Sequence, residues 1–171
     1  MRLFAFLSFH LNVVASALLL LTVPAQSADP PEHRASLKGI PAIKVVVESL
    51  DRQAERDGLT EDQLQNDVEL RLQKAGIKVT SSLEEAGSSY LYLCVGTVKH
   101  PSGLYAFNIT LVFKEVVILE RNQDVRLFST TWSANDKLGT VGAYKLPEVR
   151  GAVVDKVDKF IYAYLEQNPK R

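Results

Sequence analysis

The chain has 171 residues, of which 46% are hydrophobic, 20 are Lys or Arg and 20 are Asp or Glu. The formal net charge is zero and the two signs are interspersed, which gives no electrostatic reason to bind nucleic acid or an anionic membrane surface. A chain of this length is sufficient for one domain with its own hydrophobic core.

The amino-terminal segment, residues 1–27, has the order of a secretory signal peptide. Arg2 supplies a positive start, a mostly apolar stretch follows, and small residues come after it. Cleavage after Ala25 or after Ser27 would start the mature chain between residues 26 and 28.

An uncleaved membrane anchor is the alternative, because the apolar stretch is near the length of a membrane span. Polar residues interrupt the stretch at Ser8, His10, Asn12 and Ser16, which favours a cleaved signal peptide. No cysteine directly follows the stretch, so a lipidated cysteine at the mature start is excluded. The sequence therefore predicts a periplasmic or secreted protein without stable membrane insertion after cleavage.

Residues 28–39 contain adjacent prolines and no apolar periodicity, so we expect them to form a flexible leader. Residues 40–168 are expected to form a single domain. Its first element is a strand over residues 42–50, followed by a charged loop over residues 51–58 that has at most a frayed helical turn.

The best-defined element is a helix from Thr60 to Ala75. Thr60 and Gln63 have the spacing of a capping box. One apolar stripe, made to lie on a sheet, comprises Leu64, Val68, Leu72 and Ala75. Gly76 is placed to end the helix in a left-handed conformation, and residues 77–79 then predict a short strand. This order predicts a right-handed crossover if the two strands are parallel.

Three more strands, residues 90–98, 104–120 and 125–133, are expected to form an antiparallel meander because their connections are short. In the longest strand, large apolar residues alternate with smaller or polar ones, so one face is expected to be buried. The pair Lys114-Glu115 interrupts the alternation, which predicts a bulge or bend.

Residues 134–145 contain Gly139 and Gly142 and are expected to be a loop. Pro147 is expected to open the last helix. The elements predict an α+β fold, a two-layer sandwich in the order β-α-β-β-β-β-α. About five strands form its mixed sheet, with two amphipathic helices on one face. The other face is expected to be partly solvated.

The sequence has no recognisable catalytic or metal-ligating constellation. His100 lies two residues from Ser102 but has no third, orienting group beside it. The segment from Gly139 to Gly142 lacks the lysine of a phosphate-binding loop. Neither a cofactor nor a metal is expected, and the protein is not expected to be an enzyme.

Cys94 is the only cysteine, so the domain has no internal disulfide. Its position in an apolar strand favours a buried small hydrophobe. An intermolecular disulfide is the alternative.

Trp132 is the sharpest remaining feature, because it precedes the glycine-containing loop. A large aromatic beside a long loop is typical of a contact surface. We therefore expect an interaction surface that comprises Trp132, Lys137, Leu138, Tyr144 and His100. The alternative is that Trp132 packs beneath a helix or beneath the loop.

The order of elements over residues 42–167, the export signal and the size resemble small bacterial envelope domains. These include the amino-terminal domain of the translocation protein TolB, the lipopolysaccharide-assembly lipoprotein LptE and the penicillin-binding-protein activator LpoB. LptE and LpoB are lipoproteins, whereas this chain has no lipidated cysteine. The segments 58–60, 74–77 and 160–169 also look like those of uncharacterised exported bacterial proteins.

This resemblance implies an accessory role by protein contact, without catalysis. We therefore expect a soluble periplasmic module that binds an envelope protein partner. The alternative is a small-ligand carrier with a closed apolar pocket of roughly 300 Å³ or more between helices and sheet. The partner, the ligand and the oligomeric state stay open at this stage.

Overall fold

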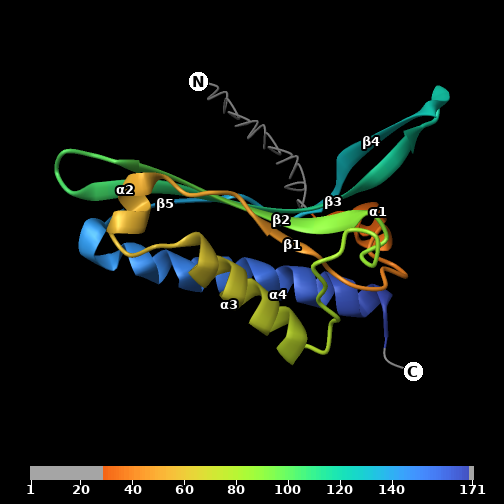
Figure 1. Ribbon diagram of the computed structural model, residues 1–171, viewed down its shortest axis with the longest axis horizontal. Helices are drawn as coiled ribbons and strands as arrows, with labels where there is room; N and C mark the ends of the chain where they lie inside the picture. Colours follow the sequence, from red (N-terminus) through yellow and green to blue (C-terminus); the bar gives the residue numbers. More distant parts are fainter. Residues whose placement is uncertain (1–28, 170–171) are drawn as a thin grey trace, which may run out of the picture.

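The computed structural model describes residues 29–169, so the expected signal peptide lies outside the described residues. The elements in chain order are α1 (Pro31–Ala35), β1 (Val45–Val47), α2 (Arg52–Arg56), α3 (Glu61–Lys74), β2 (Ser89–Lys99), β3 (Leu104–Leu119), β4 (Asn122–Ser133), β5 (Lys137–Gly142), the 3-10 helix η1 (Ala143–Glu148) and α4 (Val149–Gln167). Helices α3 and α4 lie side by side against one face of the sheet (Figure 1). The predicted α+β sandwich with a mixed sheet is confirmed.

The sheet has five strands, with β1, β2, β3 and β4 in that order and β5 paired to β3 beside β4. β1 is parallel to β2, and every other pair of strands is antiparallel. The 16-residue strand β3 therefore shares one of its edges between β4, which reaches Val112, and β5, which reaches Ile109. β3 is the central strand, because it pairs with β2, β4 and β5, and only β1 is joined to the sheet through β2.

The predicted irregularity near Lys114 is confirmed. The pairing of β3 with β4 shifts between Phe113 and Lys114. Trp132 is opposite Phe113 and Thr130 is opposite Lys114, so Thr131 is the extra residue of a bulge on β4.

Two of the expected elements differ from the structure. Residues 77–79 contribute only an isolated parallel bridge between Val79 and Ile43, not a strand. The expected loop over residues 134–145 instead contains β5 and the start of η1. A Cβ atom at Gly139 would lie 2.5 Å from the Phe107 ring, so this glycine admits the ring of the neighbouring strand rather than marking a loop.

Helix α3 has the ends that its sequence predicts. Thr60 Oγ1 accepts a hydrogen bond from the Gln63 backbone N–H at 3.3 Å, and the Gln63 side chain returns to the Thr60 N–H. At the other end, Gly76 has a φ of +78°, and the Ile77 N–H donates to the Leu72 carbonyl at 3.0 Å. This is the Schellman arrangement that the glycine predicts.

The hydrophobic core lies between the sheet and the two long helices. Its largest fully buried side chains are Trp132, Tyr105, Phe113, Phe160, Leu37, Ile43, Leu59, Leu64, Leu72, Leu91, Leu93 and Ile109. Two bidentate ion pairs, Arg71 with Asp158 and Arg150 with Asp67, join α3 to α4 at the rim of this core.

The expected flexible leader is packed against the domain within the described residues. Helix α1 lies in it, and Leu37 is completely buried in the core. The Asn168 side chain accepts from the Gly39 N–H at 2.7 Å and donates to the Leu37 carbonyl at 2.8 Å. A single apolar residue in a polar segment produces no periodicity, which is why the sequence did not indicate this contact.

The charged loop before α3 is also more ordered than expected. It contains helix α2, whose Asp51 cap accepts from the Gln53 N–H at 2.7 Å. Across residues 29–169, none of the helices combines the length and the apolar character that crossing a membrane requires.

Candidate functional site

Trp132 does not provide an exposed anchor. Its side chain is fully buried, and its ring meets Phe160 edge to face with 5.2 Å between the ring centroids. The indole N–H donates to Asp29 Oδ1 at 2.7 Å. Of the two interpretations that the sequence allows, the structure has the packed one, and the expectation of an exposed tryptophan is wrong.

The other four residues of the expected surface are exposed. Leu138 is 79% exposed and Tyr144 is 83% exposed. The Ala143 N–H donates to the Gly103 carbonyl at 2.9 Å, which places Tyr144 beside the turn that carries His100. The structure thus brings Tyr144 and His100 together at one end of the sheet, whereas Lys137 lies opposite Ile109 and Trp132 opposite Phe113, further along β3.

His100 is not part of a catalytic arrangement in the described residues. Its Nδ1 lies 2.7 Å from Ser102 Oγ and also accepts from the Ser102 N–H at 3.1 Å. Both contacts are internal to the turn and fix its shape. Among residues 29–169, no carboxylate is hydrogen-bonded to the His100 ring in the way that orients a catalytic histidine.

The structure shows a different surface that sequence reasoning missed, and we call it the arm. The arm consists of residues 115–129, the end of β3 and the start of β4 with the turn between them. β2 ends its pairing at Ser89 opposite Glu115, so beyond this point β3 and β4 continue as a two-stranded ribbon. Figure 1 shows the ribbon projecting from the body of the molecule.

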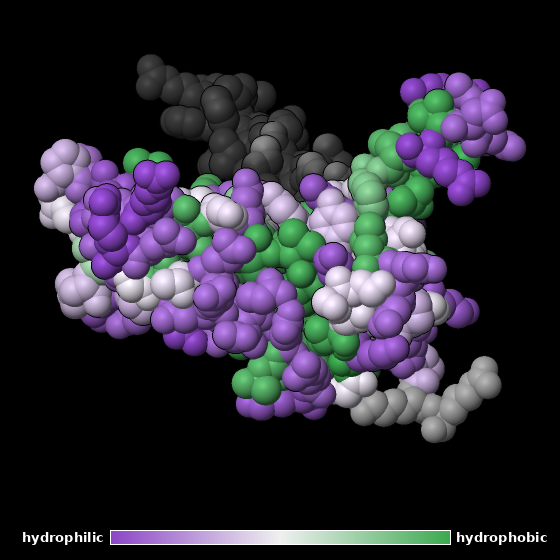
Figure 2. All heavy atoms as spheres, viewed as in Figure 1, coloured by the Kyte–Doolittle hydropathy of each residue, from purple (hydrophilic) through white to green (hydrophobic). Residues whose placement is uncertain are grey.

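Large apolar side chains are exposed along the arm. They are Val116 at 37%, Ile118 at 51%, Val125 at 37%, Leu127 at 41% and Phe128 at 43%. Figure 2 shows hydrophobic atoms along the stem of the arm and hydrophilic atoms at its tip. The excess length of the predicted strand 104–120 over the strand 90–98 was the available signal for such an extension.

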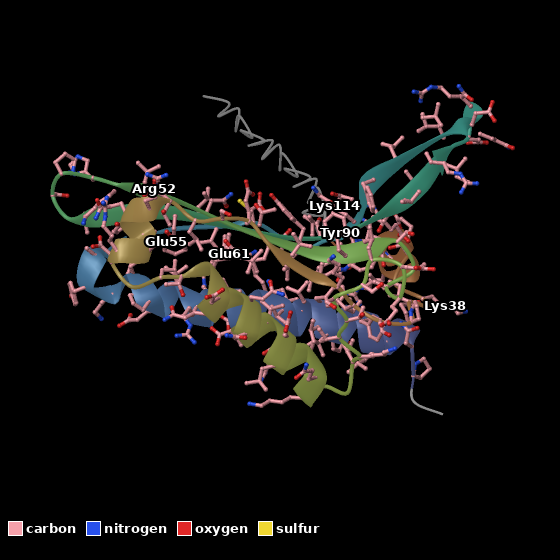
Figure 3. The ribbon with its side chains drawn as sticks, in the orientation of Figure 1. Lys38, Arg52, Glu55, Glu61, Tyr90 and Lys114 are labelled. Atoms are coloured by element: carbon pink, nitrogen blue, oxygen red, sulfur yellow. The ribbon has the colours of Figure 1, made fainter. Side chains whose placement is uncertain are left out.

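Aromatic and charged groups support the base of the arm on the sheet face that carries no long helix. Tyr90 lies 5.3 Å from Phe128, and the Lys114 ammonium lies 4.4 Å above the Tyr92 ring. Figure 3 labels Tyr90 and Lys114 near the point where the arm leaves the body. The Tyr92 hydroxyl donates to the Glu48 carboxylate, and this hydrogen bond, with burial, raises the pKa of Tyr92 to about 12.

Cys94 lies on the same face and is partly rather than fully buried. Its neighbours Leu93 and Val95 are buried on the core face of the sheet. Because side chains alternate along a strand, Cys94 lies on the opposite face. Burial, and then the hydrogen bond with Glu48, raise the pKa of the thiol to about 11. The thiol therefore stays protonated at neutral pH and is a poor nucleophile.

A cavity of about 440 Å³ lies where α1, the end of β4 and α4 meet. Trp132 and Ala134 form its apolar part, and Asp29, Arg34 and Asp158 are among its polar wall residues. The volume exceeds the roughly 300 Å³ expected of a ligand pocket. The wall is too polar, however, for the closed apolar pocket that the carrier hypothesis requires.

Within residues 29–169, no cluster of three or more His, Cys, Asp or Glu side chains is placed to hold a metal ion. A comparison of the sequence with protein-family models gives no match, and a comparison with curated proteins gives none either.

Proposed function

We propose that this protein is a periplasmic accessory module that binds a protein partner through its arm, without catalysis of its own. The observation that carries the proposal is the arm itself, a projecting ribbon whose exposed side chains include Ile118, Leu127 and Phe128. The signal-peptide pattern of residues 1–27 supports export.

As a purely structural feature the arm would be unfavourable, because it leaves large apolar side chains exposed to water. Exposed apolar side chains that gather in one place mark contact sites in proteins that otherwise bury such groups. Further back on the same strand, core residues such as Leu111 and Phe113 are completely inaccessible, although the body also exposes apolar side chains such as Leu138 and Tyr144. The difference along one strand supports a role in contact.

The outer edge of β4 adds a second reason. β4 is the last strand in its part of the sheet, so its outer backbone groups are not paired with another described strand. Such edges pair readily with another chain, and proteins usually block them with charge, proline or bulges. A partner that covers the arm would bury both the apolar side chains and this edge.

Photo-crosslinking in the bacterial envelope tests the proposal directly. A photoreactive residue at Ile118 on the arm is compared with one at Leu70, which is 50% exposed on α3. We expect a discrete crosslinked protein from position 118 alone, and we expect Leu127→Ser to reduce its yield. Equal yields from both positions, or no product from 118, would overturn the proposal.

The export part of the proposal has its own test. Mass spectrometry of the periplasmic fraction should find a mature chain that begins between residues 26 and 28. An intact Met1 in the membrane fraction would contradict it.

A further inference from the structure

The cavity beside Trp132 has the properties of a small-molecule site, and this point does not depend on the arm. Its volume of about 440 Å³ lies within the range of roughly 300–1,000 Å³ that is usual for small-molecule sites. Ala134 and Trp132 are apolar residues of its lining, and both are buried, at 5% and 0% exposure. Tyr162, which is 66% exposed, adds an aromatic ring at the wall.

The carboxylates of the cavity wall are already neutralised. Asp29 accepts from the Trp132 indole at 2.7 Å and from Arg34 Nε at 2.8 Å. Asp158 accepts two parallel hydrogen bonds from Arg71, at 2.5 and 2.6 Å. Neither acid is therefore available to attract a cationic ligand without breaking a charge-assisted pair.

Within the described residues, the positively charged side chains of the cavity wall do not all form ion pairs or hydrogen bonds with every group they have. Lys159 lines the cavity and forms no ion pair or hydrogen bond with another described residue. Arg34 uses Nε on Asp29 and Nη1 on Glu166, which leaves its Nη2 group without a described partner. Arg34 shares its single charge between two carboxylates, so Lys159 is the wall residue whose positive charge is not paired with a described acid.

A second lysine lies behind the same wall. Lys156 is only 3% exposed, and its ammonium donates to the backbone carbonyl of Asn135, another wall residue. Burial lowers the pKa of Lys156, and the neighbouring charge of Lys159 acts in the same direction, whereas Asp136 opposes it. Negative charge brought into the cavity would relieve the repulsion between these two lysines.

We propose that this cavity binds a small amphipathic monoanion, with its anionic group on Lys159 and its apolar part against the exposed Tyr162 ring, beside Ala134 and Trp132. A carboxylate with a short alkyl chain and one with a single aromatic ring both have this chemistry. The proposal concerns a ligand site and is independent of any partner bound by the arm.

Trp132 makes the test direct, because it is the only tryptophan in the chain and it lines the cavity. Octanoate and octylammonium are titrated below their critical micelle concentrations, and octanol below its solubility limit, while Trp132 emission and binding heat are recorded. A fourth titration with 3-phenylpropionate separates the alkyl acid from the aromatic acid. We expect saturable binding of at least one acid, and at least tenfold weaker binding of octylammonium and octanol.

Substitutions at Lys159 locate the site. Lys159→Gln should weaken acid binding about tenfold, the loss expected for one charge-assisted hydrogen bond. Lys44→Gln is the matched control, because Lys44 does not line the cavity, and it should leave binding unchanged. Leu127→Ser on the arm should also leave it unchanged, which separates this proposal from the proposed function.

Two results would overturn the inference. One is the absence of saturable acid binding to the wild-type protein. The other is acid binding that Lys159→Gln and Lys44→Gln affect equally, because the site would then lie elsewhere.

Discussion

The body and the arm use the same two strands in opposite ways. In the body, alternate residues of β3 such as Ile109, Leu111 and Phe113 are fully buried beneath the helices. In the arm, Val116 and Ile118 on the same strand are 37% and 51% exposed, because neither a long helix nor β2 accompanies the strand that far. Apolar residues occur along the whole of β3. Whether each of them is buried and stabilises the fold depends on the helices and strands that lie beside it.

We assign the stability of the fold to the body and contact with a partner to the arm. A core side chain should cost several kcal/mol when it is truncated, and an arm side chain should cost little.

Trp132→Ala should destabilise the protein by about 3–5 kcal/mol, because it removes a buried ring that packs on Phe160 and leaves a cavity. Urea denaturation followed by far-ultraviolet circular dichroism measures the change. Trp132→Phe is the control, since it keeps a ring and loses the indole hydrogen bond to Asp29, and it should cost less. A Trp132→Ala protein as stable as wild type would remove this residue from the core.

Gly76→Val should cost more than Gly76→Ala, and the valine variant should lose about 1–2 kcal/mol or more. Gly76 has a φ of +78°, a conformation that strains any residue with a Cβ atom and strains β-branched residues most. The free energies of unfolding of the two variants check the order. If both variants equal wild type, the end of α3 does not depend on this cap.

Tyr105→Phe should reduce the loss of stability at alkaline pH. Burial, and the hydrogen bond to Asp57 at 2.6 Å, raise the pKa of Tyr105 to about 12. In the unfolded chain a tyrosine ionises near pH 10, at about its reference pKa. The stabilisation that Tyr105 provides is therefore complete below about pH 10 and is lost as the pH rises towards 12.

Thermal melts between pH 9 and 12 measure this dependence. The wild type should lose stability more steeply than Tyr105→Phe across that window. Tyr144→Phe is the matched control, because Tyr144 is 83% exposed and its hydroxyl has no hydrogen bond of this kind to a described residue. Parallel curves for wild type and Tyr105→Phe would contradict the prediction.

The elements that depend on near neighbours in the chain could be predicted from the sequence. The cap of α3 at Thr60, its end at Gly76 and the bulge beside Lys114 all follow from residues within a few positions of each other. The two-layer arrangement also follows, because each long helix has one apolar face.

Features that depend on distant residues could not be predicted. Gly139 suggests a loop until the Phe107 ring from the neighbouring strand is seen against it. Leu37 gives no pattern by itself, although it is buried in the core. Strand alternation places Trp132 on the face of Thr130, but the bulge at Thr131 turns Trp132 to the core face, where the helix that carries Phe160 covers it.

The arm was missed for the same kind of reason. Residues 116–119 form a short apolar run of the kind that a buried strand also has, so the pattern alone does not show that β2 stops opposite Glu115. Whether a strand lies in the body or in the arm is a property of its partners, so only the pairing of the whole sheet defines the candidate contact surface.

Leu127→Ala should have the smallest effect, at most about 1 kcal/mol, and it makes the sharpest comparison with Leu111→Ala. Both substitutions remove the same atoms from a strand. Leu111 is fully buried, so its truncation leaves a cavity and should cost about 2–5 kcal/mol. Leu127 is already 41% exposed, so water fills the space at once and little transfer free energy is lost.

Paired urea denaturation curves of the two variants measure this contrast under one set of conditions. Hydrogen exchange of the arm amides in wild type gives an independent readout, because a ribbon with few buried contacts opens locally without global unfolding. If Leu127→Ala costs as much as Leu111→Ala, the arm is folded with the core as one cooperative unit. Its exposed side chains would then contribute to the stability of the body, and the division between a stabilising body and a contacting arm would fail.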